Sequence, residues 1–283
     1  MITRRTLLHA ALRTAIAAPL AGVAGFAYVR AIEPGWVDTE TRDLAQPGLD
    51  PAFDGYRLVQ LSDIHMDRWM TGTRFRGVVD TVNALAPDLI AITGDFVTNQ
   101  PLAPHLAALV PELRRLAARD GTVAVLGNHD HWTAPATVRR ALRDADVIEL
   151  SNTTRPVRRG DAVLHVAGVD DYWIGQADLA PLLDRLPTAA GAILLAHEPD
   201  FADLSAPTGR FALQISGHSH GGQISPPGLG PPLLPPFGRK YPRGQYQLGA
   251  MTQYTNRGLG MVEPYGRFGC RPEITAFTLR PAR

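Results

Sequence analysis

The chain of 283 residues is 45% apolar and 19% charged, a balance that excludes an intrinsically disordered protein and can supply one sizeable hydrophobic core. With 28 Lys and Arg residues against 27 Asp and Glu, the formal net charge is +1, which gives no support to a protein that coats nucleic acid. The single cysteine, Cys270, excludes an intramolecular disulfide and a cysteine-based zinc site.

The first 31 residues have the features of a targeting segment. Arg4 and Arg5 lie in the string TRRTLLH, which resembles a twin-arginine export signal, and residues 14–29 are uncharged and rich in Ala and Gly. This stretch is shorter than the ~20 apolar residues that a membrane span needs, and it fits the apolar region of an export signal. Residues 1–31 are therefore predicted to be an export signal or an N-terminal membrane anchor.

Three alternatives stay open for this segment. The strings GFA at 25–27 and VRA at 29–31 are imperfect matches to a small-x-small cleavage site, so cleavage and retention are equally compatible with the sequence. The third alternative, an amphipathic helix packed on the domain, is disfavoured because the segment lacks a polar face. The protein is expected to be exported or membrane-associated, and the basic flank favours an inward N-terminus for a retained anchor.

The remainder divides into a polar linker at 32–52 and one domain at 53–283. Within it, alternating or continuously apolar runs predict strands, and apolar residues at helical spacing predict helices. In chain order we expect a strand at 56–62, a helix at 75–85, a strand at 89–93, a helix at 104–118, a strand at 122–126, a helix at 136–144, and strands at 163–169, 192–196, 211–216, 245–248 and 274–279. This order predicts βαβ units and an α/β fold, a four-layer α/β/β/α sandwich of two mixed sheets flanked by helices.

Polar residues gather at the ends of five predicted strands, where α/β sheets build their sites. Five of the nine histidines lie in these strings, which are Asp63-Ile64-His65, Gly94-Asp95, Gly127-Asn128-His129-Asp130, His197, and Gly217-His218-Ser219-His220. On an extended chain residues i and i+2 point to the same side, so each Asp-x-His or His-x-His pair faces one point. His, Asp and Asn without thiolates suit Zn, Mn, Fe or Ni, and seven such residues are too many for one tetrahedral ion but enough for two.

In this order the five strings resemble the motifs of the calcineurin-like metallophosphoesterase superfamily. The resemblance implies that Asp63, His65 and His220 hold one divalent metal ion (Mn, Zn or Fe) and that Asn128, His197 and His218 hold a second. It further implies that Asp95 bridges both ions and that His129 contacts the phosphate and the leaving group. The expected reaction is in-line attack on phosphorus by a metal-bridging hydroxide, with the metals lowering the barrier more than His129 does.

The GHSHGGQ string at 217–223 and the CRPE string at 270–273 resemble a bacterial subgroup with a twin-arginine-type or membrane-anchored N-terminus. Some of its members resemble UDP-2,3-diacylglucosamine pyrophosphate hydrolases of lipid A synthesis. The favoured function is therefore hydrolysis of a phosphodiester or pyrophosphate bond, with a phosphorylated small molecule or phospholipid-like amphiphile as substrate. One alternative is an exported phosphomonoesterase or nucleotidase; another is a non-catalytic scaffold, which is disfavoured because no ligand position is lost.

The proline-rich segment 226–242 follows the last metal motif directly, so we expect it to border the site. Its apolar and basic side chains suit an acylated, phosphorylated substrate or an anionic membrane surface. The predicted substrate-binding residues are Leu233, Leu234, Phe237, Arg239 and Lys240. The alternative is a proline-stiffened loop whose leucines pack on the domain. No nucleic-acid partner is expected, and nothing in the sequence predicts an oligomeric state.

Overall fold

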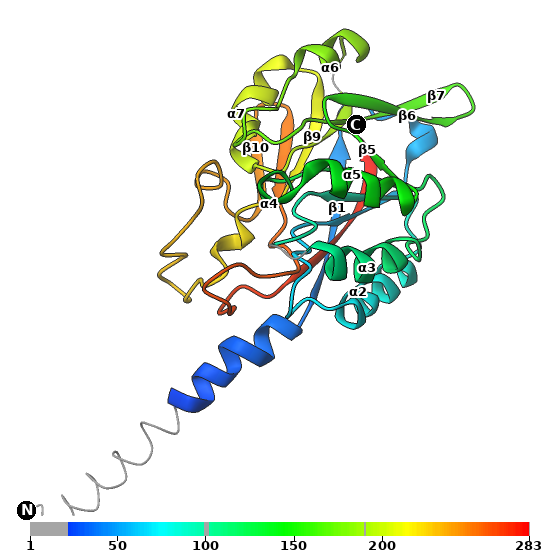
Figure 1. Cartoon of the computed structure of the whole chain (residues 1–283). Helices are drawn as coiled ribbons and strands as arrows, with labels where there is room; N and C mark the ends of the chain where they lie inside the picture. Colours follow the sequence, from blue (N-terminus) through cyan, green and yellow to red (C-terminus); the bar gives the residue numbers. More distant parts are fainter. Residues whose placement is uncertain (1–21, 99–101, 190, 283) are drawn as a thin grey trace, which may run out of the picture.

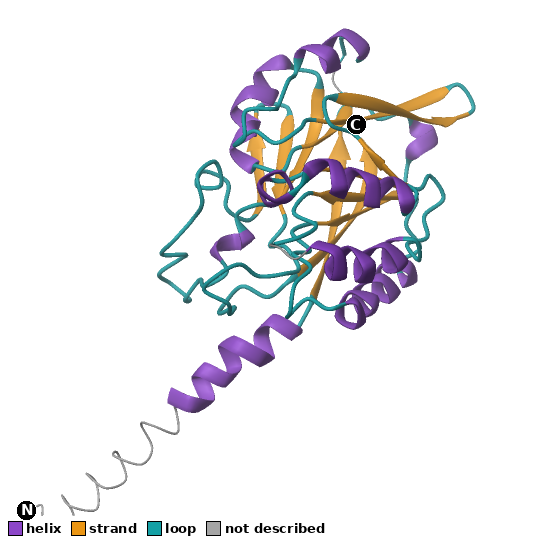
Figure 2. Ribbon diagram, in the orientation of Figure 1, coloured by secondary structure: helices purple, strands orange, loops and turns teal. Residues whose placement is uncertain are grey.

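The computed structural model describes residues 22–98, 102–189 and 191–282. Within these residues, two six-stranded sheets form the centre of the molecule (Figures 1 and 2). The first sheet contains, in spatial order, β1 (Asp38–Gln46), β12 (Glu273–Pro281), β2 (Tyr56–Leu61), β3 (Leu89–Thr93), β4 (Thr122–Val125) and β5 (Val147–Glu149). The second contains β10 (Gly244–Leu248), β11 (Met251–Thr255), β9 (Phe211–Ser216), β8 (Ala192–Leu195), β7 (Ala162–Gly168) and β6 (Thr153–Arg159).

Both sheets are mixed. In the first, only the β12–β2 pair is antiparallel among the described strands. In the second, β7, β8, β9 and β11 run parallel, and the edge strands β6 and β10 are antiparallel to their neighbours. The parallel strands bring their carboxyl ends to one edge of each sheet, which is where the polar motifs follow.

Helices cover the outer face of each sheet. The helices α2 (Gly72–Ala84), α3 (Leu102–Leu113) and α5 (Pro135–Asp144) pack on the first sheet, and α6 (Ala180–Arg185) and α7 (Ala202–Ser205) on the second. Along β3, Ile90 and Ile92 face the helices, whereas Leu89 and Ala91 face the other sheet. Burial on both faces explains why this strand is continuously apolar. The predicted four-layer sandwich of two mixed sheets is therefore confirmed.

Each predicted helix and strand is present, with differences at the ends. Helix α2 begins at Gly72, three residues before the predicted start, because the Thr71 hydroxyl accepts a hydrogen bond from the Arg74 N–H at 3.4 Å and caps the first turn. Helix α3 ends at Leu113, five residues before the predicted end, and residues 114–118 continue as turns and loop.

Four strands were not predicted: β1, β5, β6 and β11. The polar linker predicted at 32–52 contains a strand, because β1 lies there and pairs with β12 over nine residues. The strands β1, β5 and β6 lie at sheet edges, where one side is open to solvent and polar residues replace the apolar pattern that marks interior strands. Strand β11 is fully buried, yet its Thr and Gln side chains break the apolar pattern by which a buried strand is predicted.

The N-terminal part of the described chain is helical and projects from the domain (Figure 1). Its base is held by the Arg267 N–H, which donates to the Val29 carbonyl at 2.9 Å, and by an edge-to-face contact of Tyr28 with Phe268. Farther out, Val23 and Phe26 are 68% and 66% exposed. Residues 1–21, which carry most of the predicted targeting segment, lie outside the described residues. In the described part of the chain, no helix combines the length and apolar character needed to cross a bilayer.

Candidate metal centre

The predicted ligand side chains converge at the carboxyl ends of five parallel strands. Asp63 and His65 follow β2, Asp95 follows β3, and Asn128 begins the short helix α4 (Asn128–Thr133) after β4. His197 follows β8, and His218 and His220 follow β9, so both sheets contribute. All seven side chains are buried, with exposed fractions of 5% or less. The structure thus brings together the complete predicted set at one place between the two sheets.

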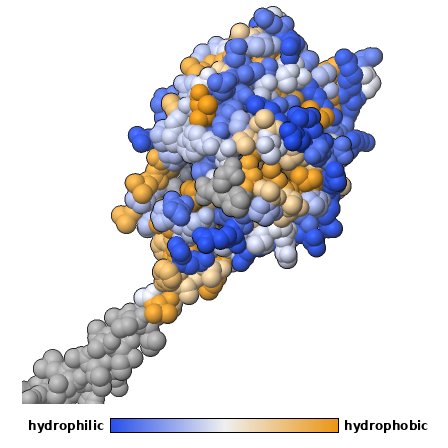
Figure 3. Space-filling model, in the orientation of Figure 1, coloured by the Kyte–Doolittle hydropathy of each residue, from blue (hydrophilic) through white to orange (hydrophobic). Residues whose placement is uncertain are grey.

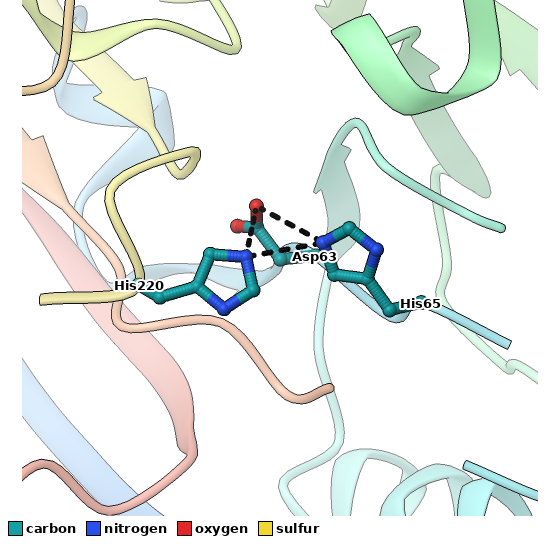
Figure 4. A group of neighbouring side chains, drawn as sticks. All are labelled: Asp63, His65 and His220. Atoms are coloured by element: carbon teal, nitrogen blue, oxygen red, sulfur yellow. Dashed lines mark hydrogen bonds and ion pairs between the residues drawn. The ribbon is translucent and has the colours of Figure 1, made fainter. Parts of the chain in front are cut away.

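One group consists of Asp63, His65 and His220 (Figure 4). The Nε2 atoms of the two imidazoles lie 3.1 Å apart. The Asp63 Oδ1 atom lies 3.3 Å from Nε2 of His220 and 4.0 Å from Nε2 of His65. The three ligand atoms therefore point at one another from two loops that are 155 residues apart in the chain.

A second group surrounds Nε2 of His197. This nitrogen lies 3.2 Å from Asp95 Oδ2, 3.2 Å from Asn128 Oδ1 and 3.3 Å from His218 Nδ1. The same Asp95 oxygen lies 3.4 Å from Nε2 of His65 in the first group. Asp95 therefore touches both groups, which is the position that the resemblance assigns to a bridging carboxylate.

Hydrogen bonds on the far side of each ring fix which nitrogen faces the centre. His197 Nδ1 lies 2.6 Å from the Thr93 carbonyl, and His218 Nε2 lies 2.8 Å from the Pro236 carbonyl. Because a carbonyl only accepts, these two nitrogens donate, and His197 Nε2 and His218 Nδ1 are the atoms that face the centre. Imidazole nitrogens, carboxylate oxygens and an amide oxygen that converge on one place are the ligand set of a divalent cation, so the residues present fit metal ions.

The backbone adopts left-handed conformations at five of the seven ligand positions. The φ angles there are positive, between 49° and 67°, at Asp63, His65, Asp95, His218 and His220. Such conformations are uncommon for non-glycine residues and cluster at functional sites. They also correct the sequence reasoning, because Asp63 and His65 meet through tightly turned backbone and not through the i, i+2 geometry of an extended strand.

Two glycines in the motifs allow the loops to approach closely. A Cβ atom at Gly217 would overlap the side chains of Ser62 and Asp63, and one at Gly127 would overlap Asp95. The glycines before Asn128 and before His218 are therefore required by packing against the opposite ligands.

Burial and mutual charge set the protonation states. Burial alone would raise the pKa of Asp63 and Asp95, but His220 and His197 respectively hold both pKa values below their usual range. Burial lowers the pKa of His65 well below its usual value and lowers that of His218 to about 3. Burial opposes a charge on His197 as well, yet the Asp95 carboxylate raises the pKa of this imidazole well above its usual value. The carboxylates are therefore ionised and stabilise positive charge at the centre.

His129 lies beside the two groups, with a ring nitrogen within 4.8 Å of ligand atoms of His65 and Asp95. Its backbone N–H donates to Asp95 Oδ1 at 2.9 Å, and its ring lies 4.8 Å from that of His65. Its Nδ1 donates to the Thr98 carbonyl at 3.2 Å, which leaves Nε2 as the atom with a free lone pair or a second proton. The side chain lines the adjoining cavity and so is placed to reach a substrate bound there.

That cavity has a volume of about 660 Å³ and opens directly over the candidate metal centre. Of the predicted substrate-binding residues, Leu233 and Leu234 line it. The other three do not line it. Phe237 meets Tyr172 edge to face, and the backbone N–H groups of Arg239 and Lys240 donate to Asp200. The Lys240 ammonium pairs with Asp203, so this end of the loop is fixed on the neighbouring helical segment.

Among the wall residues that the sequence did not predict are Trp132 and Trp173. Trp132 lies four positions after Asn128, and Trp173 lies in a loop after β7. No motif marks either residue, so only the three-dimensional arrangement reveals them. Among the described lining residues there is no Arg or Lys, and the wall beside the ligands includes tryptophan, leucine, isoleucine, valine and proline side chains.

Fold and site together define a metal-dependent hydrolase. Residues 56–222 match the model of the calcineurin-like phosphoesterase family, and the chain belongs to that family. It is 37% identical over 282 residues to the uncharacterized metallophosphoesterase YkuE of Bacillus subtilis, covering 99% of this chain and 98% of the relative. It is 30% identical over 286 residues to the phosphodiesterase YaeI of Escherichia coli, covering 99% of this chain and all of that protein. The chain is thus a metal-dependent phosphoester hydrolase.

Two further similarities cover little more than half of the other protein. A protein from Bos taurus, named transmembrane protein with metallophosphoesterase domain, is 34% identical over 251 residues, which cover 83% of this chain and 55% of that protein. The solved structure of the sulfate thiohydrolase SoxB from Thermus thermophilus in complex with glycerol superposes with a TM-score of 0.51 at 13% identity, covering 81% of this chain and 57% of that one. At this identity the second similarity supports the fold alone.

Proposed function

We propose that the protein is a dinuclear metal-dependent phosphodiesterase. Asp63, His65 and His220 would hold one divalent ion, and Asn128, His197 and His218 the other. Asp95 would contact both. The observation that carries this proposal is the contact of one Asp95 oxygen with His65 and His197, which belong to the two groups. Bound there, divalent ions such as Mn, Zn or Fe would supply activated water and neutralise phosphoryl charge.

The residues of the chain then have distinct tasks. The buried carboxylates and imidazoles would hold the ions at fixed positions beneath the cavity, where the ions would orient the phosphate of a bound substrate. His129, with Nδ1 bound to the Thr98 carbonyl, would present Nε2–H to the leaving oxygen as it departs. A proton donated to the leaving oxygen would neutralise the negative charge that develops there.

A diester is favoured over a monoester by the charge of the cavity. A phosphomonoester is a dianion near neutral pH and gains from Arg or Lys clamps. The described lining contains neither, and its extra charged side chain, Glu263, is acidic. A monoanionic diester with two organic groups suits a wall of tryptophan, leucine, valine and proline better. The name of the relative YaeI, a phosphodiesterase, points the same way.

We further propose that the substrate is an amphiphile, such as a UDP-2,3-diacylglucosamine-like lipid, reached at a membrane surface. Leu233 lines the cavity and is 74% exposed, and Leu229 in the same loop is 86% exposed. Figure 3 shows apolar surface where the N-terminal helix leaves the domain, and Val23 and Phe26 are exposed on that helix. Residues 1–31, as a signal or an anchor, would bring the domain to the membrane.

The activity is tested with purified protein supplied with Mn, Zn or Mg. We expect metal analysis to find close to two ions per chain and bis(p-nitrophenyl) phosphate to be hydrolysed faster than p-nitrophenyl phosphate. Chelation should abolish both reactions. Faster hydrolysis of the monoester would replace the proposal with the phosphomonoesterase alternative, and full activity after chelation would refute metal dependence.

The lipid proposal has a separate test. Leu229→Ser should weaken co-sedimentation with vesicles of phosphatidylglycerol and phosphatidylethanolamine, and it should leave hydrolysis of a soluble diester unchanged because Leu229 does not line the cavity. Leu204→Ser is the matched control, since Leu204 is 47% exposed on α7. Equal vesicle binding by both variants, or no hydrolysis of lipid-linked nucleotide sugars with detergent present, would argue against an amphiphilic substrate.

A further inference from the structure

We propose that Trp132 and Trp173 form a subsite for a flat, uncharged ring that the substrate carries beside its phosphate. This inference rests on the proposed phosphodiesterase function. The two indoles line the cavity and meet edge to face, with ring centroids 4.9 Å apart and planes at 76°. Trp132 lies 5.0 Å from the His129 ring, and Trp173 lies 5.5 Å from the His218 ring. The pair therefore forms an aromatic corner next to the place where the phosphate would sit.

The corner is held by buried carboxylates, so it exists before any ligand binds. Glu198, which is 1% exposed and adjacent to His197, accepts hydrogen bonds from the backbone N–H groups of Tyr172 and Trp173 at 3.1 and 3.0 Å. Asp171 accepts from the Ile174 N–H at 2.7 Å and closes the same turn. A loop fixed in this way presents the Trp173 ring at a constant distance from the metal ligands.

Trp132 is tied to the same loop from the other side. Its neighbour His131 lies 2.7 Å, Nε2 to Oδ1, from Asp170, and Arg139 donates to the other Asp170 oxygen at 2.7 Å. The two tryptophans thus belong to two segments joined by an ion-pair network. The aromatic corner is consequently a single rigid unit and not two independent loop residues.

The exposure of Trp132 indicates that this unit binds something. Trp132 remains 53% exposed at the border of the cavity, so a large part of its indole is not covered by the described part of the chain. A ring that stacks on this uncovered part of the indole and meets Trp173 edge-on fills the corner in the geometry that aromatic groups prefer. An aliphatic chain at the same place would gain only the free energy of burying apolar surface, without the additional aromatic contact.

Charge restricts the class of ring. No Arg or Lys is present among the described lining residues, and Glu263 adds negative charge at the rim. An anionic group on the ring itself, such as a carboxylate, would meet repulsion from Glu263. The ring is therefore a neutral aromatic or heteroaromatic group, for example a nucleobase or a phenyl group, attached through one ester of the phosphodiester.

The test measures binding separately from hydrolysis. Two monoanionic probes of equal size, the monomethyl esters of phenylphosphonic acid and cyclohexylphosphonic acid, are titrated calorimetrically into manganese-loaded protein. The variants are Trp132→Ala, Trp132→Phe, Trp132→Leu and Trp173→Phe. Trp36→Ala is the control, since Trp36 is also 53% exposed but lines a different cavity.

We expect wild type and Trp36→Ala to bind the phenyl ester more tightly than the cyclohexyl ester. Trp132→Ala should weaken binding of the phenyl ester by about 5- to 150-fold, the loss found when a stacking aromatic is removed. Trp132→Phe should restore much of this affinity, whereas Trp132→Leu should not. Trp173→Phe should keep part of the preference for the phenyl ester, and it provides a second measurement of the subsite if Trp132→Ala fails to fold.

Equal affinity for the two esters in wild type, or a Trp132→Ala variant that binds like Trp36→Ala, would overturn the subsite. The proposed function fails differently. It fails if the wild-type protein binds the phenyl ester but hydrolyses no diester, whereas the subsite fails if diesters are hydrolysed with no ring preference.

Discussion

The Oδ2 atom of Asp95 lies 3.2 Å from Nε2 of His197, and the same oxygen lies 3.4 Å from Nε2 of His65. One carboxylate thereby contacts ligands from both sheets. Asp95→Asn keeps the shape of the side chain and removes its charge. We expect this variant to bind fewer than half of the wild-type metal ions and to lose about 10³-fold or more in kcat, equivalent to ~4 kcal/mol.

Elemental analysis and hydrolysis of bis(p-nitrophenyl) phosphate check this expectation. Asp54→Asn is the matched control, because Asp54 is an exposed partner of Arg280 on the surface. If Asp95→Asn retains both metal content and activity, the central role of this carboxylate is wrong.

The ligand set could be predicted from the sequence because each ligand lies within a short string after an apolar strand. The backbone conformation of Asp63 and His65 could not be predicted from the sequence. The left-handed turn at Asp63 is held by hydrogen bonds from the 258–260 segment, which lies far away in the chain. The Trp132–Trp173 corner could not be predicted from the sequence either. It exists because helix α4, which follows β4, and the loop after β7 bring Trp132 and Trp173 together from different sheets, and such a long-range contact leaves no pattern in the local sequence.

His129 is predicted to act on the leaving group and not to hold metal. His129→Ala should therefore keep the wild-type metal content and lose about 10²- to 10⁴-fold in kcat, the usual contribution of a general acid. The loss should be smaller for a diester with a good leaving group such as p-nitrophenolate than for one with an alkoxide. His105→Ala, on α3, is the control. A uniform loss for both leaving groups would contradict the assignment of His129 as the acid.

Arg267 holds the backbone segment that contacts the proposed metal ligand Asp63. Its side chain is fully buried and donates to four backbone carbonyls, those of Arg257, Gly258, Gly260 and Cys270. The Gly260 N–H in turn donates to the Asp63 carbonyl at 2.7 Å. Arg267→Met removes all four of these hydrogen bonds. The Gly258 carbonyl keeps a donor, the Glu273 N–H, but the carbonyls of Arg257, Gly260 and Cys270 lose the Arg267 donor, so we expect the free energy of unfolding to fall by about 3 kcal/mol or more.

Urea denaturation monitors this change through the midpoint concentration. Arg267→Lys retains the charge and part of the hydrogen bonding and should fall between wild type and Arg267→Met. Arg280→Met, which removes a half-exposed guanidinium, should shift the midpoint little. An unchanged midpoint in Arg267→Met would mean that the 257–270 segment is held by other contacts.

The His131–Asp170 pair makes stability depend on pH. The hydrogen bond to Asp170 raises the pKa of His131 above its ordinary value of 6.5. A group whose pKa is higher in the folded state stabilises fully below the unfolded pKa and loses this contribution as pH rises through the folded pKa. The pKa of Asp170 is lowered: burial would raise it, but the hydrogen bond from His131 prevails, so Asp170 stays ionised throughout this range.

Wild type should therefore exceed His131→Gln in free energy of unfolding by about 1 kcal/mol near pH 5.5, a value reduced by the partial exposure of the pair. The difference should shrink as the pH rises past the folded pKa of His131. Comparing the two proteins at equal metal loading cancels the pH dependence of metal binding, and His105→Gln should show a constant difference. A gap between wild type and His131→Gln that stays constant from pH 5.5 to 8.5 would show that His131 is neutral in the folded protein, and the link between α4 and the Trp173 loop would then be an uncharged hydrogen bond.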